Sequence, residues 1–291
     1  MSLTETLALL KQKYFGEIET NAISTYNNEI KGKKIVPAYL FRGENRHNGS
    51  LTSKMERFRT NNKINESLRN EIHDIAIFLD KFLREHTVNE YKMPLEESAT
   101  LLQHYGFPTE VIDVTSDLNV AASFAVFGNK DGFGRIYVYS TAKLAQTTHT
   151  IDMAIFDYAR RPIRQKGYGI VHKDCKDLLI PRVRESVGFE SYDFSMSVDD
   201  IKTFERNDYL CAVEGDQVLA LFNILFEKTQ LRNMSAEAKD WLKKEIPKTQ
   251  VKNIKSITNE SGETELEIKL NPEEYISYEE WKKNRENRKY S

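Results

Sequence analysis

A short segment of the chain, residues 101–116, gathers polar side chains that could take part in chemistry. His104 lies at the end of a predicted helix, and Asp113 lies on a predicted extended segment. Thr115 and Ser116 stand where the next helix is predicted to begin, and the free backbone N–H groups of a helix start can receive a phosphate. An imidazole, a carboxylate and two hydroxyls therefore meet at one corner, where they can move protons or bind a polar ligand.

These residues also have a structural interpretation. Gln103 and His104 can cap the helix that ends beside them, and Asp113 or Thr115 can cap the helix that follows. For each residue alone, capping is the simpler explanation. Taken together, the residues favour a site.

A second candidate lies upstream, where Arg42 and Gly43 follow an apolar run at residues 35–41. The run is short and flanked by turn residues, which predicts a buried strand that Arg42 and Gly43 close. A loop rich in Asn, Gly and Ser follows at residues 45–53. The sequence therefore predicts an arginine at the end of a core strand.

The elements that must position these residues mix helices with strands. The strongest helical pattern covers residues 65–86, where apolar residues recur at steps of three and four. Another helix is predicted at 94–105, a third begins at Thr115 or Ser116, and residues 134–140 alternate as a strand should. Further predicted elements are helices at 201–210, 217–229 and 236–244, a hairpin at 256–270, and a charged helix or tail at 278–291.

The order of these elements indicates an α+β protein. Ser2 and Glu5 have the spacing of a capping box and predict a helix at the N-terminus. Because strands and helices do not alternate regularly, a doubly wound parallel sheet is not expected. We expect a single mixed domain with a helical insertion between its first strand and the segment 101–116. The expected boundaries are 1–34 for an N-terminal helical segment, 35–230 for the α+β domain, and 231–291 for a C-terminal helix–hairpin extension and charged tail.

Composition narrows the classes of partner. The 291 residues include 42 Lys+Arg and 44 Asp+Glu, a net charge of −2, so duplex DNA is not an expected partner. No apolar run is long enough to span a bilayer, and the first residues lack a secretory signal. The two cysteines, Cys175 and Cys211, cannot form a disulfide framework. We expect a cytoplasmic protein that does not contact a membrane.

Several of these motifs resemble the FRG domain family. Glu44 departs from that pattern, since the family often has Gln there, and residues 51–53 lack the usual Pro. The resemblance covers residues 35–128, with a fainter continuation at 161–168. The matching motifs are Phe41-Arg42-Gly43, Leu102-Gln103-His104-Tyr105-Gly106, Pro108-Thr109, Asp113-Val114-Thr115 and Ala121-Ala122-Ser123-Phe124-Ala125.

The order of motifs is also similar to that of ADP-ribosyltransferases of the arginine–serine–glutamate class. In that class a strand ends in an Arg-Gly pair, and a later Ser/Thr element precedes a helix with Ala and Phe. Arg42-Gly43 matches the first element, and Thr115-Ser116 resembles the second. The resemblance implies an ADP-ribosyltransferase-like core, NAD as a nucleotide ligand and substrate, and a macromolecular target.

The same resemblance implies roles for five residues in binding NAD. Arg42 would hold a phosphate bidentately, and Gly43, which has no Cβ, would leave room for the nicotinamide amide. Thr115 and Ser116 would orient a ribose or Arg42. An aromatic neighbour such as Tyr105 or Tyr168 would stack on the nicotinamide ring.

The catalytic acid is the open point of this hypothesis. His104 and Asp113 would shape the pocket, and Gln165 would contact the substrate. The transferase class places a Glu on a late strand, whereas this chain has Gln165-Lys166-Gly167 in the corresponding place. Either Gln165 acts as a binding residue, or Asp113 or Glu185 supplies the acid that stabilises an oxocarbenium-like state, or no transfer occurs.

The alternative function is a non-catalytic module that binds a nucleotide or a protein terminus, in a defence or stress pathway. A metal site is not expected, because His172 and Cys175 have H-x-x-C spacing but no second ligand pair follows. A basic group at Arg160, Arg161 and Arg164 can face an anionic ligand or simply the solvent.

Overall fold

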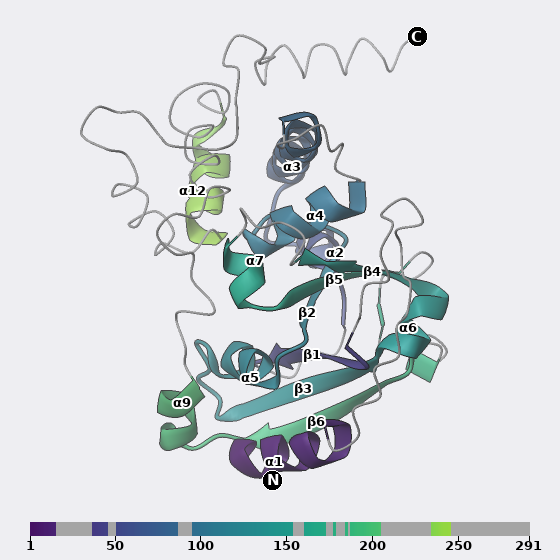
Figure 1. Ribbon diagram of the computed structural model, residues 1–291. Helices are drawn as coiled ribbons and strands as arrows, with labels where there is room; N and C mark the ends of the chain where they lie inside the picture. The colour runs from purple at the N-terminus through teal and green to yellow at the C-terminus, as the bar shows by residue number, and fades with distance from the viewer. Residues whose placement is uncertain are drawn as a thin grey trace, which may run out of the picture. The chain divides into compact units, whose positions relative to one another are not determined.

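The chain forms two compact units in the computed structural model shown in Figure 1. Unit 1 comprises Met1–Ser53, Glu110–Ile155 and Pro162–Leu210, and unit 2 comprises Lys54–Thr109, Phe156–Arg161 and Cys211–Ser291. The structure describes residues 1–15, 37–45, 51–86, 95–153, 160–172, 177–178, 184–185, 187–204 and 234–245.

Unit 1 is built on a six-stranded sheet with the order β4-β5-β2-β1-β3-β6. Each recorded pairing between neighbouring strands is antiparallel. The motif-bearing strands β1 and β2 therefore lie side by side at the centre of the sheet. The strands are β1 (Tyr39–Glu44), β2 (Ile112–Thr115), β3 (Phe133–Ser140), β4 (Thr148–Asp152), β5 (Gly167–His172) and β6 (Phe189–Ser195).

Alternation along β1 assigns its side chains to the two faces of the sheet. Phe41 belongs to a core formed with helices α1 and α5, whereas Leu40 belongs to a second core with Tyr137, Tyr139 and strand residues of β2 and β5. Arg42 therefore lies on the Leu40 face. The described helices of this unit are α1 (Leu3–Phe15), α5 (Leu118–Val126), α6 (Thr141–Thr147) and α9 (Val198–Phe204), and α7 (Arg160–Arg164) leads into β5.

Helix α1 begins at the predicted capping box. The Ser2 backbone N–H donates to Glu5 Oε2 at 2.8 Å, and the Glu5 N–H donates to Ser2 Oγ at 3.2 Å. At the other end of the helix, Lys13 Nζ pairs with Glu190 of β6 at 2.6 Å. The Lys13–Glu190 pair joins α1 to β6, which lies beside it in Figure 1.

Helix α5 approaches β1 closely at Gly43. A Cβ built on Gly43 would lie 1.8 Å from the carbonyl oxygen of Ala121 and 2.8 Å from the backbone N of Ala125. No side chain larger than hydrogen fits between this strand and this helix. Gly43 therefore sets the distance between α5 and the centre of the sheet.

Unit 2 is helical in its described part. Its elements are α2 (Lys54–Thr60), α3 (Glu66–His86), α4 (Leu95–His104) and α12 (Ala236–Glu245). Asn65 caps α3 by accepting from the Leu68 N–H at 2.7 Å. The rings of Phe58 and Trp241 meet at 4.9 Å between centroids, which joins α12 to α2. Among the described helices of both units, none is long and apolar enough to cross a bilayer.

The α+β class is confirmed, and so is the helical insertion, because α2, α3 and α4 lie between β1 and β2 in the chain. Two local predictions were wrong. Arg42 and Gly43 do not close the first strand, because both pair with β3 and the strand continues to Glu44. The helix after β2 begins at Leu118, because the Asp117 side chain caps it by accepting from the Asn119 N–H.

Other predictions concern residues outside the described ranges. These are the hairpin at 256–270, the helix at 217–229, the charged tail, and both cysteines. The domain boundaries at 34 and 230 also fall in such ranges and stay predictions.

We expect Gly43→Ala to destabilise unit 1 strongly, because the new Cβ meets backbone atoms that can move only with the whole helix. Overpacking of this kind costs typically about 1–3 kcal/mol and more where backbone must shift. Urea unfolding measures the loss. Gly128→Ala is the control, since Gly128 has positive φ but open space around it, and its cost should stay near about 1 kcal/mol. Equal costs for the two variants would contradict the packing role of Gly43.

Candidate functional site

Arg42 is the charged centre of the candidate site. Its Nε donates to Glu44 Oε1 at 3.3 Å, and its Nη1 donates to the backbone oxygen of Asp113 at 2.7 Å. A guanidinium has five N–H donors, so these two bonds leave donors for a ligand. The side chain is 17% exposed. Burial opposes the charge, but the nearby carboxylates of Glu44 and Asp113 outweigh it, so the pKa of Arg42 lies above its ordinary value.

Glu44 is an acid that the sequence interpretation did not assign to the site. It follows Arg42 by two positions on the same strand, so both side chains lie on one face of the sheet. Its side chain is only 6% exposed. Within the described part of the chain, its Oε2 is buried and has no hydrogen-bond partner. Side chains alternate between the two faces of a strand, so Glu44 could have been placed beside Arg42 from the sequence if the first strand had been predicted to continue to Glu44.

Two tyrosines of β3 border this ion pair. Tyr137 lies opposite Arg42 in the strand register, and Tyr139 lies opposite Leu40 on the same face. The Tyr137 hydroxyl accepts from Arg135 Nη1 at 3.4 Å. The Tyr139 hydroxyl is buried, and among the described residues it has no hydrogen-bond partner. Burial raises the pKa of Tyr139, so its hydroxyl stays protonated and can donate a hydrogen bond.

Thr115 and Gln165, 50 residues apart, meet where β2 pairs with β5. Thr115 Oγ1 donates to the Gln165 backbone oxygen at 2.6 Å and accepts from the Asp117 N–H at 3.0 Å. The adjacent Ser116 N–H donates to the Lys166 carbonyl at 3.1 Å. The hydroxyl proton of Thr115 is therefore used within the protein. The segment at Thr115 and Ser116 is joined to the segment at Gln165 and Lys166 by bonds to backbone oxygens.

An ion pair reinforces the same junction. Asp117, the cap of α5, pairs with Lys166 Nζ at 2.8 Å. Lys166 has φ of 43°, a left-handed conformation that side-chain-bearing residues rarely adopt. Partial burial opposes the Asp117 charge, but Lys166 and the N–H groups of α5 outweigh it, so the pKa of Asp117 lies below its ordinary value.

Six of the predicted site residues lie in unit 1. Arg42 contacts the backbone of Asp113, and Thr115 contacts the backbone of Gln165. Gly43 faces helix α5 on the other side of the sheet from Arg42, so its visible role is packing, and its contact with nicotinamide stays a prediction. A direct ligand contact of Ser116 is likewise untested.

His104 and Tyr105 lie in unit 2 and are both buried. Helix α4 ends at His104, and Gly106 with φ of 93° turns the chain, as the sequence indicated. The Oε1 of Gln103 accepts from the hydroxyl of Thr109 at 2.9 Å, which joins the end of α4 to the segment that follows it. The catalytic role of His104 and the stacking role of Tyr105 stay predictions.

The described residues hold no group of three or more His, Cys, Asp or Glu side chains placed to bind a metal ion. The polar groups gathered around Arg42 are instead a carboxylate, a phenol and a guanidinium. Such groups bind the hydroxyls, amides and phosphates of an organic ligand.

The fold and the site define an α+β protein with a buried Arg–Glu pair at the centre of an antiparallel sheet. Residues 37–132 match the FRG domain, so this part of the chain contains an FRG domain. The match spans β1, the helical insertion, β2 and α5, which include Arg42, Glu44 and the junction at Thr115. Comparisons with curated proteins and with solved structures gave no match.

The Asp117–Lys166 pair predicts a pH-dependent contribution to stability. The folded pKa of Asp117 lies below its ordinary value of 3.8, so its contribution is complete above that pH and is lost as the pH falls through the folded pKa. Asp117→Asn keeps an N-cap and removes the charge. We expect the wild type to be more stable by less than about 1 kcal/mol at neutral pH, because Lys166 is exposed.

Thermal unfolding of both proteins between neutral pH and about pH 3 measures this difference. It should shrink as the pH falls below the ordinary pKa of Asp117. A difference that stays constant over this range would contradict the role of the ion pair.

Proposed function

We propose that the FRG domain of this chain binds NAD at Arg42, Glu44 and Tyr139 and transfers ADP-ribose from it to a macromolecule. One observation carries the proposal: Glu44 Oε2 and the Tyr139 hydroxyl are buried beside Arg42 without partners among the described residues. Buried polar groups in native proteins are almost always satisfied, so a cluster of exceptions calls for an explanation such as a ligand.

Arg42 is suited to bind the pyrophosphate of NAD. Its pair with Glu44 and its bond to Asp113 fix the orientation of the guanidinium before a ligand arrives. The donors that remain can contact phosphate oxygens, a geometry in which Arg exceeds Lys. Binding then does not require Arg42 to leave Glu44.

Glu44 supplies the carboxylate that the expected position at Gln165 lacks. In the transfer, the bond between nicotinamide and C1′ of the ribose breaks, and nicotinamide leaves with the electron pair. A nucleophile on the target forms a new bond to C1′ and loses its proton to solvent. The positive charge that develops on the ribose would be stabilised by the Glu44 carboxylate in this poorly solvated place.

The second candidate function is nucleotide binding without turnover. It is favoured by the ion pair itself, since Arg42 already neutralises much of the Glu44 charge. The two functions differ in one observable result: whether bound NAD releases nicotinamide.

Glu44→Gln tests the catalytic role while keeping the shape of the side chain. We expect NAD affinity within a few-fold of wild type and nicotinamide release slower by about 100-fold or more, in the range known for loss of one electrostatic contact to a transition state. Chromatographic assay of nicotinamide and calorimetric titration of NAD give the two readouts.

The matched control is Glu185→Gln, which removes the other acid that the sequence suggested, and which should leave release unchanged. Binding of NAD without release by the wild type would establish the second function. No binding and no release would overturn both functions.

Tyr139→Phe tests whether the hydroxyl serves a ligand or the fold. Because the hydroxyl is buried without a described partner, we expect the melting temperature to stay equal or rise, by the equivalent of up to about 1 kcal/mol. NAD affinity should fall by about ten-fold, the loss of one hydrogen bond. Tyr137→Phe is the control for stability, since its hydroxyl accepts from Arg135 and its removal should lower the melting temperature slightly. A large loss of stability in Tyr139→Phe would contradict the proposal.

A further inference from the structure

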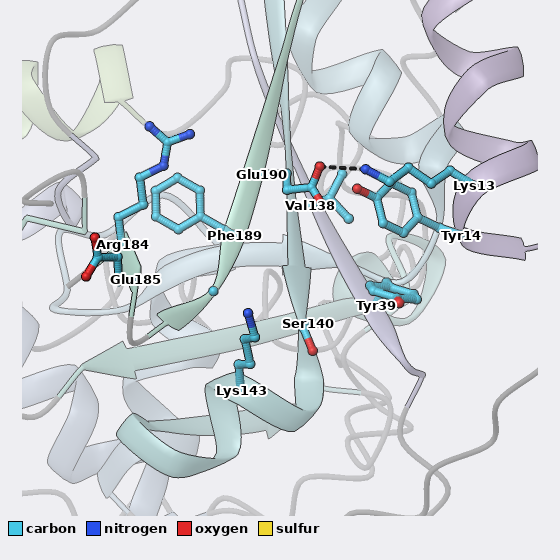
Figure 2. A pocket seen from close by; sticks show the side chains of 11 residues that line it. Lys13, Tyr14, Tyr39, Val138, Ser140, Lys143, Arg184, Glu185, Phe189 and Glu190 are labelled. Carbon is cyan, nitrogen blue, oxygen red and sulfur yellow. Dashed lines mark hydrogen bonds and ion pairs between the residues drawn. The ribbon is translucent and has the colours of Figure 1, made fainter. Parts of the chain in front are cut away.

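A hollow of about 670 Å³ lies in unit 1 at the end of the sheet where β1 begins and β3 ends. Its volume is that of a site for a small organic ligand. Figure 2 shows its lining side chains, which come from α1, β1, β3, α6 and the start of β6. Tyr39, at the start of β1, belongs to this hollow, whereas Arg42 points to the opposite face of the sheet. The Tyr39 side of the hollow therefore lies on the other face of the sheet from the site proposed for NAD, and Phe189 at its edge packs on Tyr139 of that site at 5.4 Å between ring centroids.

The hollow contains an ammonium group, that of Lys143, which no described carboxylate neutralises. On one side, Lys13 pairs with Glu190 at 2.6 Å and donates to Tyr192 at 2.8 Å, so these charges are satisfied. Lys143 extends from α6 into the space between Phe189 and Tyr39 in Figure 2. Among the described residues it has no carboxylate partner.

Lys143 is an exposed side chain that passes close to the backbone of Gly188. Gly188 has φ of 65°, and a Cβ on it would overlap Cδ of Lys143. The aliphatic part of Lys143 therefore lies directly over Gly188, with its ammonium directed into the hollow.

A second unused polar group lies three residues before Lys143. Ser140 occupies the N-cap position of α6, yet its side chain makes no cap hydrogen bond. It lines the hollow, and within the described chain its hydroxyl has no recorded partner. Because the Ser140 hydroxyl does not cap α6, it can donate a hydrogen bond to a ligand oxygen.

The remaining walls fit an aromatic ring. The rings of Tyr14 and Tyr39 meet edge to face at 4.7 Å between centroids, and Phe189 carries the guanidinium of Arg184 at 5.3 Å from its centroid. Tyr39 is half-buried, so part of its ring can contact a ligand. The lining thus combines cations and aromatic rings with the exposed carboxylate of Glu185 beside Arg184, and the part around Lys143 and Tyr39 suits a molecule that joins a phosphate to a base.

We propose that this hollow is a second site, which binds a nucleotide with its phosphate at Lys143 and Ser140 and its base against Tyr39. Lys is a suitable phosphate ligand as a point charge, and the exposed Arg184 adds attraction at the rim. This site goes beyond the NAD function proposed above and does not depend on it.

Calorimetric titration of the full chain with AMP, and separately with inorganic phosphate, tests the site. We expect AMP to bind at least five-fold more tightly than phosphate, because only AMP reaches the aromatic wall. Lys143→Gln, which keeps the carbons over Gly188 and removes the charge, should weaken AMP binding about ten-fold. Lys202→Gln, the same change on exposed helix α9, should leave it unaltered.

Two further variants make the result decisive. Ser140→Ala removes a hydroxyl without a fold role and should weaken AMP binding several-fold at an unchanged melting temperature. Tyr139→Phe should not alter AMP binding, which separates this hollow from the Arg42 site. The proposal is overturned if AMP fails to bind, if AMP and phosphate bind equally, or if Tyr139→Phe and not Lys143→Gln weakens AMP binding.

Discussion

The guanidinium of Arg42 is a permanent charge held inside the sheet, and the surrounding structure is arranged to tolerate it. Glu44 neutralises it from the same strand, and the Asp113 carbonyl accepts from it across to β2. A buried charge without such partners would cost several kcal/mol, roughly the whole margin of stability of a small domain. The partners use only part of the guanidinium, and the Glu44 and Tyr139 atoms beside it have no described partner. These atoms are the basis of the ligand site proposed above.

Two constraints keep this arrangement in place. Gly43 lets α5 lie against the other face of β1, so the strand that carries Arg42 is fixed from behind. The junction of Thr115 with Gln165 and of Asp117 with Lys166 fixes β2 and the start of α5 against β5. The first constraint acts on backbone alone, and the second combines bonds to backbone with the partly exposed Asp117–Lys166 ion pair. A rigid backbone around a charged group is what a preorganised binding site requires.

The sequence predicted the parts of this account that depend on neighbouring residues. The capping box at Ser2 and Glu5, the turn at Gly106 and the helical insertion follow from local spacing, and the structure has all three. The FRG motifs identified the FRG domain because the residues of each motif are contiguous. The sequence did not assign Glu44 to the site, because the first strand was predicted to close at Arg42 and Gly43. Glu44 was therefore not placed on the same face of the sheet as Arg42. The bond between Thr115 and Gln165 depends on pairing of strands about 50 residues apart, which no local pattern records. Lys143 and Ser140 were missed for the same reason, since the hollow around them joins five separate elements.

The central claim is that the Arg42 cluster receives a ligand. Nuclear magnetic resonance of the arginine side-chain N–H groups, with Arg42 assigned through an Arg42→Lys variant, observes this cluster directly during titration with NAD. The account predicts that the Arg42 signals shift and saturate with NAD, while those of Arg135, which is engaged with Asp193, stay in place. Unchanged Arg42 signals at saturating NAD would contradict it.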